Sequence, residues 1–266
     1  MPATCNAWVL KRRPEGRLTR DDFDWQTSTL PDPADGQVLV RTLYLSLDPT
    51  NRIWASDMDQ YMPPVQLGEV MRGGTLGVVE ASAHPDYQPG DLVQGMWGWA
   101  SHTLAAGGAG LNKIPHTEGV PLDAYMSVLG ATGMTAYFGL LDIGRPEAGE
   151  TVVVSAAAGA VGQIVGQIAR IKGCRVVGTA GSDAKCRHLV DDLGFDAAIN
   201  YKTADLDREL AAACPKGIDV YFENTGGPVT DAVLKLVNQN ARIPLCGLIA
   251  HYNEGYNSEG VRGPNN

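Results

Sequence analysis

The first part of the chain is a series of short apolar segments separated by proline and glycine. Four such segments, rich in Val, Leu and Trp, span residues 7–12, 37–47, 73–82 and 91–99. Turn residues, as in the sequence QPGD at 88–91, separate them. Short apolar runs separated by proline, glycine and other turn residues are typical of strands joined by turns. Residues 1–125 are therefore predicted to form a β-rich, barrel-like domain.

The remaining residues, 126–266, contain apolar strands that alternate with helical segments. Strands are predicted at 151–155, 175–179, 197–200, 218–222 and 242–247. This alternation predicts a parallel, doubly wound sheet, so the chain belongs to the α/β class. The helix predicted after Gly159 places its apolar residues at i, i+3, i+4 and i+7 spacing, which would pack one face on the sheet. These residues are Val161, Ile164, Val165, Ile168, Ala169 and Ile171.

Composition narrows the class of ligand. The 266 residues carry a formal net charge of -9 and no Lys/Arg cluster, which disfavours a nucleic-acid partner. The five cysteines lack CxxC spacing, so neither a disulfide framework nor a structural zinc site is predicted. No signal-peptide pattern and no apolar run of about 18 residues occurs. We expect a soluble cytoplasmic protein with a small-molecule partner and no nucleic-acid or membrane partner.

A dinucleotide-binding turn is predicted between the first strand of the second domain and its helix. The expected GxGxxG has become AAGAVG at 157–162. Such a turn presents backbone N–H groups and a helix N-terminus to a pyrophosphate, for which small residues suffice. We expect alanine only where φ stays negative, and Gly159 and Gly162 where the cofactor approaches most closely. The alternative is a tight strand–helix packing turn.

The end of the next strand indicates which dinucleotide binds. An NAD site would place Asp or Glu about 20 residues after the turn. Residues 178–182 instead read GTAGS. Ser182 and Lys185 can meet a 2′-phosphate, which favours NADP(H) over NAD(H). The alternative is that Lys185 is a solvated helix residue.

Seven segments together resemble one enzyme family. They are YLSLDPTNR (44–52), GATGMTAYFGLLDIG (130–144), AAAGAVG (156–162), GCRVVGTAGSDAKC (173–186), NYKT (200–203), YFENTGG (221–227) and CGLIAHYN (246–253). The chain resembles zinc-independent medium-chain dehydrogenases/reductases of the leukotriene B4 12-hydroxydehydrogenase and prostaglandin reductase group, particularly bacterial NADPH-dependent curcumin reductases. The resemblance implies a GroES-like β-barrel followed by a Rossmann domain, NADPH as cofactor, and α,β-unsaturated aldehydes or ketones as substrates.

The resemblance also assigns roles to individual positions. It implies that the turn holds the pyrophosphate, that Tyr201 lies on the adenosine side, and that Pro49 and Thr50 face the nicotinamide from the barrel. The predicted cofactor-binding residues are Pro49, Thr50, Ala156, Ala157, Ala158, Gly159, Ala160, Val161, Gly162, Gly181, Ser182, Lys185, Tyr201, Asn224, Cys246, Gly247, Leu248, Ile249 and Tyr252.

The chain departs from the family pattern at several places. Members commonly read DPYMR where this chain has Thr50 and Asn51, so an aromatic wall of the substrate pocket is missing. Ala131 and Thr132 stand where Met-Pro is usual. Members also continue to a sixth Rossmann strand and a returning helix, and are commonly dimers through that strand. The Rossmann domain is therefore expected to be incomplete, with a homodimer expected of the full-length chain.

The expected chemistry uses no metal. Asp48 and the sequence MRGG at 71–74 replace the ligand positions of zinc-dependent relatives. The histidines share no ligand spacing; they are His84, His102, His116, His188 and His251.

Hydride addition to the β-carbon of an enone places negative charge on the carbonyl oxygen. Tyr252 is the predicted catalytic residue that donates to this enolate, because a phenol with a pKa near ~10 stays protonated at neutral pH. Alternatively, Tyr252 stacks on the nicotinamide or caps a loop. Cys246 is interpreted as a small residue under the cofactor rather than a nucleophile. Trp97, Trp99 and Tyr61 are candidates for either an apolar substrate wall or the core.

The leading hypothesis is an NADPH-dependent reductase of the alkenal/one or curcumin type. A quinone reductase on the same fold is the first alternative. A non-catalytic NADPH-binding protein is the second.

Overall fold

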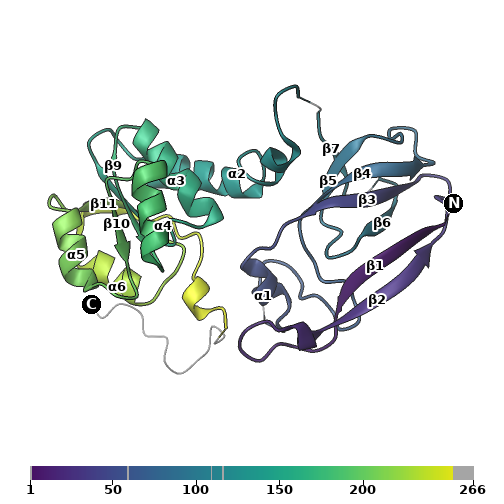
Figure 1. Cartoon of the computed structure of the whole chain (residues 1–266), viewed down its shortest axis with the longest axis horizontal. Coiled ribbons are helices and arrows are strands. Elements are labelled where there is room, and N and C mark those ends of the chain that lie inside the picture. The colour runs from purple at the N-terminus through teal and green to yellow at the C-terminus, as the bar shows by residue number, and fades with distance from the viewer. Residues whose placement is uncertain (1, 59, 109, 116, 254–266) are drawn as a thin grey trace. The chain divides into compact units, whose positions relative to one another are not determined.

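A computed structural model describes residues 2–58, 60–108, 110–115 and 117–253 (Figure 1). The chain divides into two compact units, Met1–Met126 and Ser127–Asn266. In the described part of the chain, no helix is long and apolar enough to cross a membrane.

The first unit is built on antiparallel strands. Its larger sheet has the order β6-β3-β4-β5-β7, and a second sheet pairs β1 with β2. Isolated bridges from Ala7 to Ala100 and from Val9 to Val70 connect β1 to segments beside the larger sheet. The strands are β1 (Ala3–Leu10), β2 (Phe23–Leu30), β3 (Gln37–Leu45), β4 (Thr75–Ser82), β5 (Leu92–Gly95), β6 (His102–Ala106) and β7 (Asn112–Lys113).

From the sequence, Trp97 and Trp99 are candidates for either a substrate wall or the core, and in the structure both pack against core residues of this unit. Trp97 packs against the cluster of Val38, Val40, Val79 and Val93, and its indole N–H donates to the Thr42 hydroxyl at 2.8 Å. Trp99 packs in a second cluster, with its ring centroid 5.2 Å from that of Phe23. Both side chains are partly buried and pack against core residues, which favours the core interpretation.

The second unit is a parallel sheet in the order β10-β9-β8-β11-β12. Alternate residues of β8 face opposite helix layers, as they must in a strand. Val152 and Val154 pack in the cluster that includes residues of α2 and α3, whereas Val153 packs in the cluster that includes residues of α5 and α6. The sheet is therefore covered on both faces, which confirms the doubly wound α/β fold.

The elements of this unit follow the chain in regular alternation (Figure 1). They are α2 (Ala131–Phe138), β8 (Thr151–Val154), α3 (Ala160–Ile171), β9 (Arg175–Ala180), α4 (Asp183–Arg187), β10 (Ala197–Asn200), α5 (Leu206–Ala213), β11 (Ile218–Phe222), α6 (Pro228–Leu234) and β12 (Val237–Arg242).

The fifth strand does not lie at 242–247, where the apolar pattern predicts it, but at Val237–Arg242. Its register with β11 shifts between the pairs Ile218–Val237 and Val220–Arg242, and Asn240 has a positive φ of 65° at this irregularity. Beyond it, Pro244 has no N–H for a ladder. Only an isolated bridge between Glu223 and Leu245 continues the pairing.

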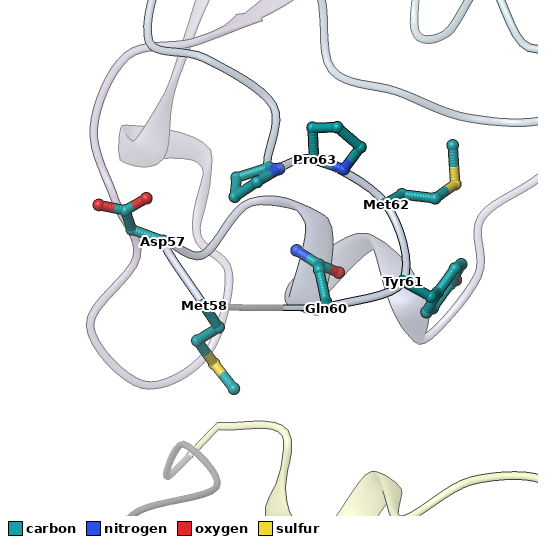
Figure 2. A pocket seen from close by; sticks show the side chains of 7 residues that line it. Asp57, Met58, Gln60, Tyr61, Met62 and Pro63 are labelled. Carbon is teal, nitrogen blue, oxygen red and sulfur yellow. The ribbon is translucent and has the colours of Figure 1, made fainter.

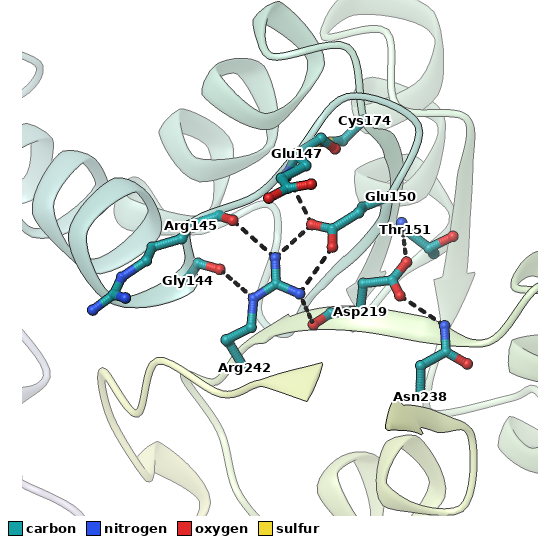
Figure 3. A network of polar contacts seen from close by, with 9 residues as sticks. All are labelled: Gly144, Arg145, Glu147, Glu150, Thr151, Cys174, Asp219, Asn238 and Arg242. Atoms are coloured by element: carbon teal, nitrogen blue, oxygen red, sulfur yellow. Dashed lines mark hydrogen bonds and ion pairs between the residues drawn. The ribbon is translucent and has the colours of Figure 1, made fainter. Parts of the chain in front are cut away.

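Arg242 holds the end of β12 in place (Figure 3). Its guanidinium pairs with the Glu150 carboxylate and donates to the carbonyls of Gly144, Arg145 and Asp219. Because these contacts depend on a single charged side chain, the apolar pattern gives no sign of them. The prediction of an apolar fifth strand was therefore wrong by several residues.

The α3 helix packs on the sheet through the face that the sequence predicts, except at Ile171. Val165 and Ala169 are buried in the core cluster, and Val161, Ile164 and Ile168 pack against it. The buried residues of the helix are Gly162, Val165, Gly166 and Ala169, whereas Ile171 is 84% exposed. A Cβ added at Gly166 would lie 1.9 Å from the Phe195 ring, so the helix approaches this ring more closely than any side chain would allow. Gly162 and Gly166 lie on this same buried face, where the absence of a side chain allows close packing.

Candidate functional site

The predicted cofactor residues of the second unit gather at one edge of its sheet. From β8 the chain runs through β9 and β10 on one side, then crosses to β11 and β12 on the other. In open parallel sheets, ligands bind at the carboxyl ends of the strands, at such a switch in strand order. The turn at 156–162 follows β8, and residues 181–185 follow β9. Tyr201 follows β10 and Asn224 follows the end of β11.

The turn after β8 begins with a strained alanine. Ala156 has a φ of 47°, in the left-handed region that L-residues other than glycine seldom occupy. The expectation that alanine occurs here only at negative φ was therefore wrong. The cost of such a conformation is about 1 kcal/mol, and neighbouring contacts must stabilise it. One such contact is the hydrogen bond from Ala157 N–H to the Thr179 carbonyl, at 2.9 Å.

Gly162 is required by packing within the turn itself. A Cβ at this position would lie 2.5 Å from the Ala156 carbonyl oxygen and 2.7 Å from the Ala157 Cα. At Gly159 an added Cβ would meet only the Ala156 carbonyl oxygen, at 3.1 Å. Gly162 therefore makes room for the start of α3 against the turn, and its close approach to the cofactor stays a prediction.

The start of α3 presents donors suited to an anion. Gly159 is the N-cap and makes no side-chain cap, and the Gln163 N–H closes the first helical turn onto the Gly159 carbonyl at 3.0 Å. Within the described chain, the N–H groups of Ala160, Val161 and Gly162 donate to no protein acceptor. Three such N–H groups at a positive helix end fit one phosphate of a dinucleotide.

Two lysines belong to the segments that follow β9 and β10: Lys185 lies in α4, and Lys202 follows β10. Ser182 is the N-cap of α4, and its hydroxyl accepts from the Lys185 N–H at 3.4 Å. A Cβ at Gly181 would lie 3.1 Å from the Tyr201 hydroxyl and 3.2 Å from Cε of Lys202. The structure thus brings Gly181 and Tyr201 together, and it adds Lys202. This lysine stands next to Tyr201 in the NYKT segment, which is the only signal in the sequence that could have found it.

The loops after β11 and β12 are tied to each other and to β8. The Asn224 N–H donates to the Ser155 hydroxyl, and its side-chain amide donates to the Ser155 carbonyl, both at 2.7 Å. The Asn224 carbonyl accepts from Ile249, while the Glu223 carbonyl accepts from Cys246 and Gly247. The predicted residues Asn224, Cys246, Gly247, Leu248 and Ile249 therefore lie in one connected group.

Tyr252 follows a short 3-10 helix at Ile249–His251. It does not directly follow the fifth strand, since that strand ends at Arg242. The phenol oxygen accepts a hydrogen bond from the Leu248 N–H at 3.3 Å and lies beside Gly247. Accepting this bond does not use the hydroxyl proton, because a phenol both donates and accepts. The role of Tyr252 in catalysis stays a prediction.

Three further residues of this edge were missed by sequence reasoning: Ser155, Glu223 and His251. His251 packs against Gly226, and its buried Nδ1 has no hydrogen-bond partner among the residues that the structure describes. A buried nitrogen without a partner is rare in a folded protein unless a ligand or water meets it. With the open N–H groups of α3, it indicates that these residues fit a bound dinucleotide.

In the first unit, the predicted residues Pro49 and Thr50 lie at the N-terminus of α1 (Thr50–Trp54), and their contact with the cofactor stays a prediction. The Thr50 hydroxyl lies 3.0 Å from that of Tyr61, whose side chain is 74% exposed. Asn51 is buried and binds the Asp48 N–H and the Arg72 carbonyl, so it shapes the loop rather than a pocket surface.

A cavity of about 390 Å³ lies on this same unit (Figure 2). Tyr61 is one of the residues that line it, and its role in a substrate pocket stays a prediction. The lining residues are Asp57, Met58, Gln60, Tyr61, Met62, Pro63 and Pro64.

Among the described residues, no group of three or more His, Cys, Asp or Glu side chains is arranged to hold a metal ion. His116 lies outside the described residues.

Comparisons with known proteins agree with this geometry. Residues 6–114 match the family model described as the N-terminal domain of oxidoreductase, and residues 160–261 match the one described as zinc-binding dehydrogenase. The NADPH-dependent curcumin reductase of Escherichia coli is 50% identical over 92% of this chain and 71% of its own length. The chain belongs to the zinc-independent medium-chain dehydrogenase/reductase family. Within that family it groups with the curcumin and prostaglandin reductases.

Other members of this family support the assignment. Prostaglandin reductase 1 of Mus musculus is 44% identical over 93% of the chain and 73% of its own length. The crystal structure of CurA from Vibrio vulnificus in complex with NADPH superposes with a TM-score of 0.91 at 46% identity. The match covers 98% of this chain and 76% of that one.

Proposed function

We propose that this chain is an NADPH-dependent reductase of the carbon–carbon double bond of α,β-unsaturated aldehydes and ketones. The observation that carries the proposal is its likeness to the NADPH complex of CurA, at a TM-score of 0.91 and 46% identity. The curcumin and prostaglandin reductases among its relatives support the substrate class. The open N–H groups at the start of α3 support the binding of a dinucleotide.

In this proposal the second unit binds NADPH along the carboxyl edge of its sheet. The start of α3 holds the pyrophosphate, and Ser182, Lys185 and Lys202 hold the 2′-phosphate. Two ammonium groups beside a serine hydroxyl would favour a phosphate over a free ribose hydroxyl. Asn224 and the loop from Cys246 to Tyr252 then face the nicotinamide half.

The bound NADPH supplies a hydride to the β-carbon of the substrate. The chain must stabilise the negative charge that this addition leaves on the carbonyl oxygen, and a proton must reach the α-carbon. In the proposal, the Tyr252 hydroxyl donates a hydrogen bond to that oxygen. One well-placed donor of this kind lowers the barrier by roughly 3 kcal/mol. Thr50 and Tyr61 of the first unit contribute to the substrate pocket, together with the cavity at Asp57–Pro64.

The test is consumption of NADPH by the full-length protein with small enals, enones and a curcumin-like dienone, followed by product analysis. Reduction of the double bond with the carbonyl retained is the expected result. Turnover of quinones alone would replace the proposal with quinone reduction. Tight NADPH binding without turnover of any of these compounds would replace it with a non-catalytic role.

The proposal includes a cytoplasmic location and a homodimer of the full-length chain. The five cysteines are free thiols, which is compatible with a reducing compartment, and the proposed reaction needs a compartment that supplies NADPH. Cell fractionation and the mass of the protein in solution test the two statements separately.

A further inference from the structure

A buried carboxylate lies where the loops of the cofactor edge meet. Glu223 directly follows β11 and is 1% exposed. One carboxylate oxygen accepts from the Ser155 hydroxyl at 2.8 Å, the Thr225 N–H at 2.6 Å and the Gly226 N–H at 3.0 Å. The other accepts from the Thr230 hydroxyl. Glu223 therefore joins β8, its own loop and α6.

All four of these donors are neutral. Within the described residues, no Lys, Arg or His nitrogen lies within 4.0 Å of the Glu223 carboxylate, in contrast to the paired Glu150. Burial works to raise the pKa of Glu223, but donors from Thr230, Thr225 and Gly226 outweigh it and hold the pKa below its ordinary value. The group is thus an anion at neutral pH. A buried charge without a counter-ion is costly, and such charges are rarely kept without a partner.

The position of Glu223 indicates what its partner is. The pyrophosphate site at α3 follows β8, and the basic residues for the 2′-phosphate follow β9 and β10, on one side of β8. The nicotinamide half of the cofactor must then extend to the other side, over the end of β11. Glu223 lies at that end. When NADPH gives up its hydride, both electrons of the bond leave with the hydrogen, and the ring gains one positive charge.

We propose that the Glu223 carboxylate is the fixed counter-charge for the oxidised nicotinamide ring, so that it strengthens the binding of NADP⁺ relative to NADPH and favours hydride release. The proposal rests on the proposed function. The Glu223 carboxylate also repels the pyrophosphate and the 2′-phosphate. This repulsion is the same for NADPH and NADP⁺, so it cancels in the ratio of their two dissociation constants. A unit charge about 10 Å away at an effective dielectric of about 20 corresponds to roughly a tenfold change in this ratio.

The experiment measures the dissociation constants of NADP⁺ and NADPH separately, by calorimetry or quenching of protein fluorescence, without any substrate. Glu223→Gln keeps the shape of the side chain, and the Thr230 hydroxyl can turn to accept from the new amide. We expect it to raise the ratio Kd(NADP⁺)/Kd(NADPH) roughly tenfold. For a two-electron couple, this raises the potential of the bound cofactor by about 30 mV.

Three control variants separate charge from structure. Thr230→Val removes one donor and keeps the anion, so the ratio should stay at the wild-type value. Glu223→Asp also keeps the anion, so both affinities should fall together. Asp207→Asn removes an exposed negative charge from α5 and should change neither the ratio nor the activity.

An unchanged ratio in Glu223→Gln, or an equal rise of the ratio in Thr230→Val, would overturn the proposal. If Glu223→Gln does not fold, Glu223→Ala, which also removes the charge, decides: a raised ratio supports the counter-charge, and an unchanged ratio refutes it. A failure of the proposed function is distinct, because the wild-type protein would then bind neither form of the cofactor or reduce no enone.

Discussion

The Arg242 guanidinium and the Glu150 carboxylate form a two-point ion pair between the end of β12 and the start of β8. Arg242 Nη1 lies 2.9 Å from Glu150 Oε1, and Nη2 pairs with the other carboxylate oxygen. Both side chains are mostly buried, at 29% and 22% exposure. The pair connects the most irregular strand of the sheet to its centre.

This ion pair should make stability depend on pH. The hydrogen bond from Arg242 is the largest cause that holds the pKa of Glu150 below its ordinary value of 4.5. A lowered carboxyl pKa stabilises the fold at higher pH, and this contribution is lost as pH falls through the folded-state pKa. Glu150→Gln should therefore cost about 1–2 kcal/mol of unfolding free energy at neutral pH and almost nothing near about pH 3.

Urea unfolding of wild type and variant across this pH range measures the difference. The matched control is Glu209→Gln, because the Arg208–Glu209 pair is solvent-exposed. This control should change stability by less than about 0.5 kcal/mol at any pH. A cost for Glu150→Gln that does not depend on pH would contradict the ionic explanation.

The central strands of the second unit could be predicted because they are buried on both faces. Such strands contain continuous apolar runs, as at residues 152–154 and 220–222, which sequence alone displays. β2 was missed for the opposite reason. Its sequence, FDWQTSTL, buries only Phe23, so it shows no alternation of apolar and polar residues.

The site was predictable only in part, because some of its contacts join residues that are far apart in the chain. Ser155 and Glu223 are 68 positions apart, and although Glu223 lies in the YFENTGG segment, nothing in either local sequence indicates that the two side chains meet. The turn and the end of β9 were found because each has a local signature of small or basic residues. The positive φ of Ala156 was missed because it is set by the packing of α3 on the turn and not by the residue type.

Ala156 offers a test of that backbone strain. Glycine adopts a φ of 47° without the Cβ clash, so relief of strain in Ala156→Gly should stabilise the fold by about 0.5–1 kcal/mol. The greater backbone entropy of glycine in the unfolded state opposes part of this gain. The control is Ala158→Gly, at a position without positive φ, where stability should fall because backbone entropy and the packing of the Ala158 methyl on the core are both lost. Denaturant unfolding compares the two variants. A loss of stability in both would show that the turn holds Ala156 without strain.

Lys202 and Lys185 should set the preference for NADPH over NADH. If both meet the 2′-phosphate, Lys185→Ala and Lys202→Ala should each weaken NADPH binding roughly tenfold and leave NADH binding unchanged, because NADH has no phosphate there. Lys172→Ala, at the other end of α3, removes the same charge far from the carboxyl edge. Its affinity for both cofactors should equal that of wild type. Equal losses for NADPH and NADH in Lys202→Ala would exclude a direct phosphate contact.

Two roles are possible for Tyr252, donation to the substrate oxygen or a structural contact, and a single substitution distinguishes them. Phenylalanine keeps the ring but removes the hydroxyl. If the phenol donates to the substrate oxygen, Tyr252→Phe should lower kcat roughly ten- to a hundredfold with little change in the KM for NADPH. If the ring only stacks or the hydroxyl only caps the Leu248 N–H, kcat should stay within about twofold of wild type. Tyr44→Phe, at an exposed position of β3, is the matched control for loss of a phenol. Steady-state rates with an enone substrate decide between the two roles.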